Sequence, residues 1–276
     1  MSLKLPADFV ADYGALLRSV ASELTDDREY CAFAARCGNA YAPGGLMFYG
    51  RATNGWTRDS SFTCATLEQP TRLADTILSG SQEPICSPYG EAGPPGPYLM
   101  LKDESCDGDP MHWLKHRRKN ITENRSQYWQ CAKEVASRHL HLDEATWHRH
   151  IAWSNLYKIG PQQPIGSTQA AGNPSTKLQK VQRPGCARIV EREVAHFRPS
   201  CIVFLTETNE DRGYIDDFVE HLTLRTVKPN AGLKYVRATG KLHAFGNDYN
   251  VVLAQHPQGR PPLAVAEDVL RAVSSL

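Results

Sequence analysis

Polar side chains that could take part in chemistry gather at three places in the sequence, each directly after a short apolar run. The first is the glycine-bounded stretch 50–56, the second is Asn155, and the third is 256–260, which begins with His-Pro. They carry guanidinium, amide and imidazole groups, which bind ligands through hydrogen bonds and charge. If the fold brings the three places together, they form one polar ligand site.

The apolar runs themselves have the length of buried β-strands. These strands are predicted at 46–49, 150–157, 201–205 and 250–254. Helical patterns separate them, and strands that alternate with helices favour a parallel sheet covered by helices. The carboxyl ends of parallel strands share one edge of the sheet, where open α/β sheets bind their ligands. The three polar places are therefore expected to converge at that edge.

Helices are predicted from apolar residues at helical spacing. The predicted segments are 7–23, 26–37, 123–140, 187–196, one near 215–222 and a final helix over 263–276. Pro184-Gly185 is expected to interrupt the chain before the 187–196 helix. Glu191 and Glu193 are two residues apart and fall on different faces of that helix, so they are interpreted as surface or supporting side chains and not as a catalytic pair.

Composition limits the class of protein. The chain has 276 residues, 41% hydrophobic and 22% charged, with a formal net charge of +1. These values exclude a disordered tail, a collagen-like repeat and a coiled-coil rod. A single domain over residues 1–276 is expected, with an irregular insertion near 80–120 that is rich in Gly and Pro. Since the net charge is near zero, any nucleic-acid site must depend on a local basic patch.

Location and metal content are also constrained. No stretch approaches the ~18 apolar residues of a membrane span, and no secretory signal is visible at the start, so a cytoplasmic monomer without membrane contact is expected. The eight cysteines lack the C-x-x-C spacing of zinc and iron–sulfur sites. We therefore expect reduced thiols, no metal and no cofactor. The cluster His139, His141, His148 and His150 likewise lacks accompanying cysteine ligands.

The order of the three polar places resembles that of the uracil-DNA glycosylase superfamily. In that family a glycine-containing motif follows the first strand, an Asn follows the second, and a His-Pro motif follows the last. The similarity covers most of residues 40–275 in order and spacing, with few matching letters. It implies an α/β fold with a four-stranded parallel sheet sandwiched between helices, and a monofunctional DNA glycosylase that acts on a flipped-out base.

The resemblance assigns catalytic roles by position. Asn155 would hydrogen-bond the polar edge of the flipped base, and His256 would stabilise negative charge on the departing base. Family members often carry an Asp or Asn that positions the attacking water at the third place of the first motif. Here that place is Ala52, followed by Thr53. Asn54 is the favoured replacement, with Asp59 as an alternative.

The same motif bears on the substrate. A Tyr that blocks bases with a 5-substituent stands in the uracil-specific pattern where this chain has the smaller Asn54. The pocket is therefore expected to admit a bulky 5-substituted cytosine, such as glucosylated hydroxymethylcytosine in phage DNA, which suggests an anti-phage defence role. Trp56 or Phe62 would stack on the base. The implied base-binding set is Gly50, Arg51, Ala52, Thr53, Trp56, Phe62 and Asn155.

DNA would be held by a local basic run and by loop residues. The run Lys115, Arg117, Arg118 and Lys119, with Arg125 nearby, would contact phosphates and make binding salt-dependent. Asn173 and Ser175 open a helix whose start could face a phosphate, and a simple cap is the alternative. Gln258 and Arg260 follow His256 in the last motif, and Arg260 could fill the gap left by the flipped nucleotide.

Three other functions stay open at this point. The fold could serve as a catalytically silent DNA-binding module, for which Ala52 is the main support, or as a uracil-specific repair glycosylase. The third is a hydrolase or nucleotide-binding enzyme of another family, but the sequence contains neither the Gly-x-Ser-x-Gly motif nor the phosphate-loop motif expected of such enzymes. None of the three polar motifs contains Lys, so a Schiff-base lyase step is not indicated.

Overall fold

A mixed β-sheet with helices on both faces forms the centre of the molecule. The computed structural model describes residues 5–24, 28–52, 61–64, 67, 69–81, 127–143, 146–162, 174–208, 213–230 and 232–276. Its seven strands follow the order β2-β5-β3-β7-β10-β9-β8. They are β2 (Arg36–Cys37), β3 (Leu46–Ala52), β5 (Ile151–Tyr157), β7 (Cys201–Glu207), β8 (Thr223–Pro229), β9 (Val236–Ala244) and β10 (Asn247–Gln255).

The four strands predicted from apolar runs are present and adjacent. In the structure β5, β3, β7 and β10 pair in parallel, so their carboxyl ends lie at one edge of the sheet. These strands are buried on both faces, and such strands read as nearly continuous apolar runs. This property made them visible in the sequence.

The predicted fold class, a four-stranded parallel sheet between helices, is wrong. The sheet has seven strands, of which β2, β9 and β8 run antiparallel to their neighbours. A second, three-stranded antiparallel sheet has the order β4-β1-β6, formed by β1 (Glu29–Ala32), β4 (Ser61–Thr63) and β6 (Ile159–Pro161). No residue of β8 is buried, and buried residues of β9 alternate with more exposed ones, so these strands lack the continuous apolar run that marks a central strand.

The helix predicted over 26–37 is also wrong. This segment contains β1 and β2, one in each sheet, and residues 30–38 are buried throughout. A short run that is buried on all sides has no amphipathic period to separate a helix from a strand. The helix expected near 215–222 is a single 3-10 turn, η5 (Tyr214–Phe218).

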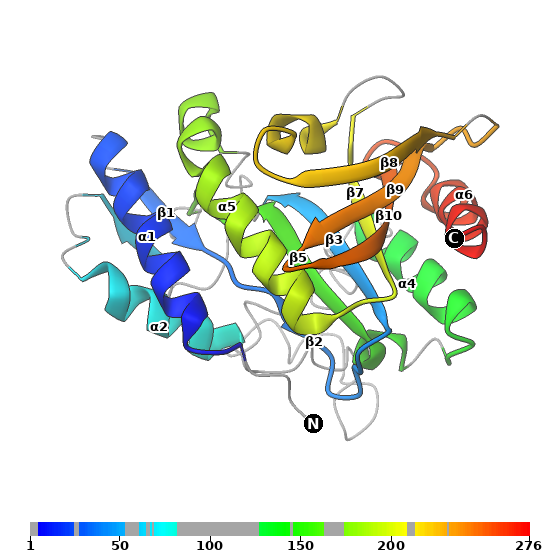
Figure 1. The fold of residues 1–276 in the computed structure, drawn as a ribbon, viewed down its shortest axis with the longest axis horizontal. Coiled ribbons are helices and arrows are strands. Elements are labelled where there is room, and N and C mark those ends of the chain that lie inside the picture. Colours follow the sequence, from blue (N-terminus) through cyan, green and yellow to red (C-terminus); the bar gives the residue numbers. More distant parts are fainter. Residues whose placement is uncertain are drawn as a thin grey trace, which may run out of the picture.

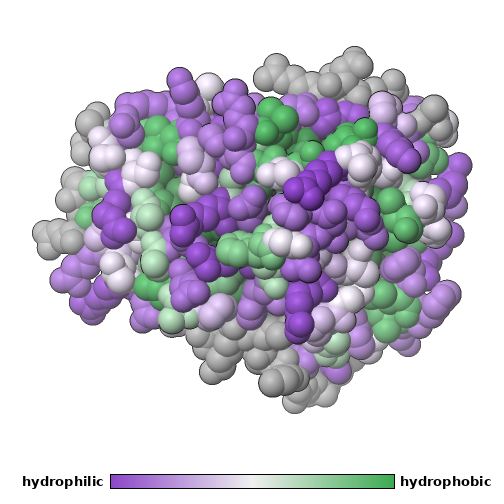
Figure 2. All heavy atoms as spheres, in the orientation of Figure 1, coloured by the Kyte–Doolittle hydropathy of each residue, from purple (hydrophilic) through white to green (hydrophobic). Residues whose placement is uncertain are grey.

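Helices form a layer on each side of the large sheet (Figure 1). One core contains residues of α1 (Asp8–Glu23), α2 (Pro70–Ser81) and α5 (Thr176–Phe197). The other contains residues of α4 (Gln127–His139), the 3-10 helix η4 (Trp147–His150) and α6 (Pro262–Ser274). Among the described residues, no helix combines the length and apolarity needed to cross a membrane. On the face drawn in Figure 2, hydrophilic residues separate the apolar patches.

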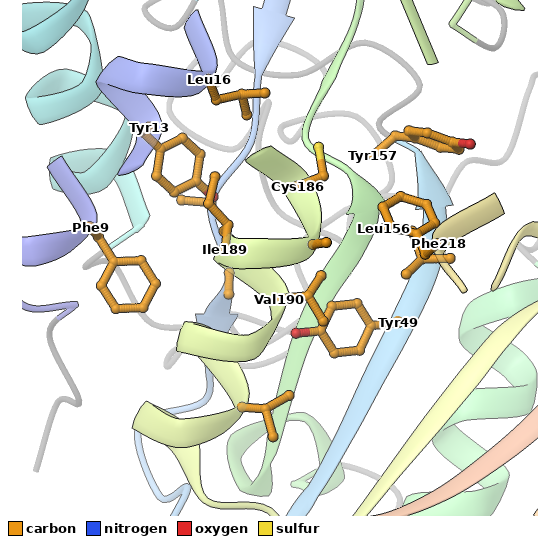
Figure 3. Packing of buried hydrophobic residues seen from close by; sticks show 14 of the residues in the cluster. Phe9, Tyr13, Leu16, Tyr49, Leu156, Tyr157, Cys186, Ile189, Val190 and Phe218 are labelled. Carbon is orange, nitrogen blue, oxygen red and sulfur yellow. The ribbon is translucent and has the colours of Figure 1, made fainter. Parts of the chain in front are cut away.

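Helix α5 continues through the point where Pro184-Gly185 was expected to interrupt it. Gly185 lies against α1, and a Cβ at that position would come 2.9 Å from Cδ1 of Leu16. The close approach lets Tyr13 of α1 pack near Ile189 of α5 (Figure 3). Packing against α1 therefore outweighs the cost of about 3 kcal/mol that a proline adds inside a helix.

A buried ion pair fastens α5 to the sheet. Nζ of Lys158 lies 2.7 Å from Oε2 of Glu193, and both side chains are 0% exposed. The Tyr49 hydroxyl and the Ser154 hydroxyl each donate to the same Glu193 oxygen at 2.8 Å. Burial lowers the pKa of Lys158 from its ordinary value. Of the two interpretations offered for Glu193, the surface one is wrong, because its side chain is fully buried; helical spacing alone does not reveal which face of a helix is covered.

Removing one member of this pair should destabilise the fold strongly. Lys158→Met leaves the Glu193 carboxylate buried without its cation, so we expect the free energy of unfolding to fall by about 3–5 kcal/mol. Urea denaturation measures this change. Glu220, which is exposed, serves as a control, and Glu220→Gln should stay within about 0.5 kcal/mol of the parent. A loss below about 1 kcal/mol for Lys158→Met, typical of a surface pair, would contradict the assignment.

Candidate active site

The carboxyl ends of the four parallel strands bring the predicted polar residues to one edge. Gly50 at the end of β3 pairs in register with Asn155 near the end of β5. Gln255 at the end of β10 pairs with Glu207 at the end of β7, and His256 follows directly. Residues more than 200 positions apart in the sequence therefore share one edge of the sheet.

The absence of a side chain at Gly50 makes room for the Asn155 amide. A Cβ at Gly50 would lie 2.4 Å from Oδ1 of Asn155, closer than two such atoms can approach. The Asn155 residue is only 3% exposed. Its Nδ2 has no hydrogen-bond partner among the residues that the structure describes. A buried amide donor of this kind costs about 1–3 kcal/mol if left unsatisfied, so the site is suited to a ligand with an acceptor.

His256 is held as a neutral hydrogen-bond donor. Its backbone N–H donates to the Glu207 carbonyl at 2.8 Å, which fixes the start of the loop. Its ring Nδ1 accepts from the Gln258 backbone N–H at 3.1 Å, so the proton of the neutral ring lies on Nε2. Burial, together with the charges of Arg51 and Arg260, lowers the pKa of His256 to about 3. At neutral pH the imidazole can therefore donate from Nε2 without carrying charge.

Tyr128, in the first turn of α4, lies near both of these groups and was missed in the sequence. Its ring centroid is 6.0 Å from that of His256, with the planes inclined by 31°. A Cβ at Gly50 would be 3.7 Å from Cε2 of the same ring, next to the Asn155 amide. Tyr128 is thus an aromatic wall shared by both sides of the site. Its spacing in the sequence resembles that of any core aromatic residue, so no signal distinguished it.

Arg51 and Gln258 link the first motif to the last. Nη2 of Arg51 donates to Oε1 of Gln258 at 3.2 Å, and the guanidinium lies 5.3 Å from the Tyr214 ring centroid. The contact places the Arg51 charge near His256, which contributes to the lowered pKa of the imidazole. The two predicted motifs are therefore in direct contact.

Arg260 holds the loop that carries His256. Its Nε donates to Oε1 of Gln255 at 2.6 Å, Nη1 donates to the His256 carbonyl at 3.0 Å, and Nη2 donates to the Thr208 carbonyl. The guanidinium is therefore already hydrogen-bonded to backbone and side-chain groups of the protein. Insertion of Arg260 into DNA stays a prediction and would require these bonds to break.

Two other predicted residues have structural roles in the described fold. Ser175 caps α5, because its hydroxyl accepts from the Leu178 backbone N–H at 3.2 Å. Phe62 lies in β4 of the small sheet, 94% buried, with its ring 6.0 Å from that of Tyr30. The structure does not bring Phe62 into contact with Asn155 or His256 through any described interaction.

Several predicted residues cannot be placed. The predictions for Thr53, Asn54, Trp56, Asp59, Lys115, Arg117, Arg118, Lys119, Arg125 and Asn173 lie outside the described residues.

Ala52 is the last residue of β3, opposite Tyr157 of β5. Within the described ranges, no group of three or more His, Cys, Asp or Glu residues is arranged to hold a metal ion.

Glu207 is a buried carboxyl at the same edge that the sequence did not single out. Nε of Arg237 lies 2.7 Å from its Oε2, and the Thr206 hydroxyl donates to its Oε1 at 3.0 Å. Burial raises the pKa of Glu207 to about 7, although Arg237 and Thr206 act to lower it. Gly213 packs so closely on the carboxylate that any Cβ there would overlap it. The carboxyl is therefore enclosed, while its backbone carbonyl holds His256.

The raised pKa predicts a dependence of stability on pH. The folded carboxyl binds its proton more tightly than the same carboxyl in the unfolded chain. Its contribution to the free energy of unfolding is therefore full below about pH 4 and is lost as the pH rises to about 7. Between about pH 5 and pH 8, the free energy of unfolding should fall by about 2–3 kcal/mol more in the parent than in Glu207→Gln. Urea denaturation at both pH values tests this difference. Parallel pH profiles for the two proteins would be inconsistent with it.

Comparisons with known proteins do not assign this site. Neither protein-family models nor curated protein sequences give a match to this chain. The function must therefore be argued from the geometry of the site.

Proposed function

We propose that this protein is a monofunctional DNA glycosylase that hydrolyses the N-glycosidic bond of a flipped-out, modified pyrimidine and leaves an abasic site. The proposal rests on the buried, unpartnered amide donor of Asn155 and the neutral imidazole of His256, which both lie near the Tyr128 ring. Tyr128 forms an aromatic wall beside them. This combination fits a planar ring with polar atoms on its edge.

Asn155 would recognise the edge of the base. A pyrimidine base carries a carbonyl that can accept from Nδ2 of Asn155, and the amide oxygen of Asn155 can accept from an amino or imino group. Extrusion of the base from the helix requires such contacts to compensate for lost stacking and pairing. Since the Asn155 donor is already buried in the free protein, it would lose little solvation when the base binds.

His256 would act on the leaving group. When the N-glycosidic bond breaks, its electron pair goes to the base, which becomes an anion, and the sugar becomes cationic. A neutral imidazole that donates from Nε2 to a base oxygen stabilises this charge, and one such donor is worth about 3 kcal/mol. Water then adds its oxygen to C1′ of the deoxyribose, and its proton is taken up by the base anion, which leaves as the neutral base. Asn54 is the proposed residue for positioning this water.

The proposed substrate class is a bulky 5-substituted cytosine, with glucosylated hydroxymethylcytosine as the specific candidate. Its support is the small polar residue Asn54 at the place where uracil-specific relatives have Tyr. A uracil-specific enzyme is the alternative among glycosylases. The silent DNA-binding module is favoured by one feature, namely Ala52 at the place where related enzymes carry the water-positioning Asp or Asn.

Two segments are proposed to contact the DNA phosphates. One is the start of α5 at Ser175. The other is the basic run that includes Lys115 and Arg117, which lies outside the described residues. Leu263, in the first turn of α6, follows the His256 loop and is 62% exposed. Apolar side chains are common wedges between base steps, and the guanidinium of Arg260 is occupied. We therefore assign the wedge to Leu263 in preference to Arg260.

The first test is base release from duplex and single-stranded DNA that contains uracil, mismatched thymine, 5-hydroxymethylcytosine or its glucosylated forms, with abasic sites cleaved by alkali. We expect release of one modified pyrimidine. His256→Ala and Asn155→Ala should each lower the single-turnover rate about 10²–10³-fold, because each removes a donor aimed at the base. DNA affinity should change little. His243→Ala and Asn39→Ala, at exposed or partly exposed positions, serve as matched controls.

Two results would contradict the proposal. Unchanged release in both His256→Ala and Asn155→Ala would remove these residues from catalysis. DNA binding without release of any base in the panel would favour the silent module.

A second prediction concerns the wedge. Leu263→Ala should lower base release from duplex DNA about tenfold while leaving release from single strands nearly unchanged, because only the duplex must be held open. Leu276→Ala, another exposed leucine at the end of the chain, is the matched control. Equal losses on both DNA forms would argue against a wedge.

A further inference from the structure

The side chain of Gln127, the first residue of α4, contacts the loop that follows His256. Oε1 of Gln127 accepts from the Gly259 backbone N–H at 2.7 Å. Nε2 of the same side chain donates to the Arg260 carbonyl at 3.3 Å. The amide thus bonds to backbone groups of two consecutive residues of this loop. Gln127 and His256 are far apart in the sequence, and neither motif analysis nor helical spacing singled out Gln127.

The other supports of this loop come from the sheet. The His256 N–H is bonded to Glu207 of β7, and Arg260 bonds to Gln255 at the end of β10. These contacts fix the loop relative to the strands. Gln127 belongs to the helical layer on one face of the sheet, and the next residue is Tyr128, the wall of the site. The Gln127 contact therefore sets the separation between the loop and this wall.

We propose that Gln127 is a positioning residue, which holds the 256–260 loop against the first turn of α4 so that the His256 imidazole packs on the Tyr128 ring. The catalytic part of this inference rests on the proposed glycosylase function. The structural part concerns the free protein and is measurable without any DNA.

Loss of the contact has a direct consequence for the imidazole. The groups that face it are Arg51 from β3, Arg260 from its own loop and Tyr128 from α4. If the loop separates from α4, water reaches the ring on the Tyr128 side while both arginines stay in place. Burial is the larger cause of the low pKa, so the pKa of His256 should rise from about 3 toward its ordinary value near 6.5.

The experiment compares Gln127→Met with Gln127→Glu. Methionine keeps the length of the side chain and removes both hydrogen bonds. Glutamate keeps the acceptor for the Gly259 N–H but replaces the donor with a carboxylate oxygen, which repels the Arg260 carbonyl oxygen. Gln179→Met is the matched control, because Gln179 also donates to a backbone carbonyl, that of Pro174, but in the first turn of α5. The readouts are an NMR titration of the His256 ring, hydrogen exchange at the Gly259 amide, and single-turnover base release.

We expect Gln127→Met to raise the pKa of His256 by at least about one unit and to speed exchange at Gly259 about tenfold or more. Base release should fall about tenfold to a hundredfold, as for a reacting group displaced by about 1 Å, with DNA affinity within about twofold. Gln127→Glu should retain slow Gly259 exchange and part of the rate, and Gln179→Met should leave all three readouts unchanged.

An unchanged His256 titration and unchanged Gly259 exchange in Gln127→Met would overturn the inference. A fall in activity with an unchanged titration would do the same, because it would show a role other than positioning the imidazole. Absence of base release in the parent protein would instead count against the proposed function. The titration and the exchange would still decide the role of Gln127 in that case.

Discussion

The pairing of β3 with β5 places Tyr49 opposite Ser154 and, one residue further, Gly50 opposite Asn155. Successive residues of a strand face opposite sides of the sheet. Tyr49 and Ser154 therefore face α5, where both donate to Glu193, while Gly50 and Asn155 lie on the side of Tyr128. A slip of one residue would exchange the two faces and destroy both arrangements together. The buried ion pair and the position of the Asn155 amide thus both depend on the register between β3 and β5.

The chemistry proposed for this edge needs a donor that is fixed and uncharged. Several backbone bonds meet at His256 and leave the proton of the ring on Nε2, and burial keeps the ring neutral. A charged imidazole would carry a large desolvation cost in such a place, and a free loop would let water compete for the donor. The loop is therefore held to the sheet by the bonds of His256 to Glu207 and of Arg260 to Gln255, and to α4 by Gln127.

Much of the central sheet could be predicted, because β3, β5, β7 and β10 are apolar runs of strand length. The antiparallel strands β8 and β9 could not, because β8 has no buried residue and β9 alternates between buried and partly exposed residues, so neither contains a continuous apolar run. The continuous helix α5 could not either, since the effect of Pro184 is offset by contacts with α1 that are remote in the sequence.

For the site, the positions of Asn155 near the end of β5 and of His256 directly after β10 were visible in the sequence. Tyr128, Glu207 and Gln127 depend on contacts between distant segments, which no local pattern records. Tyr128 and Gln127 begin α4, and their proximity to His256 arises only when α4 packs beside the end of β10.

The most direct test of the account is a crystal structure with duplex DNA that contains a 2′-fluorinated analogue of the modified cytidine, in which the fluorine slows cleavage of the N-glycosidic bond. We expect a flipped base beside Tyr128, with one base oxygen within hydrogen-bond distance of Nδ2 of Asn155 or Nε2 of His256. A base that stays stacked in the duplex, or that binds away from this edge of the sheet, would contradict it.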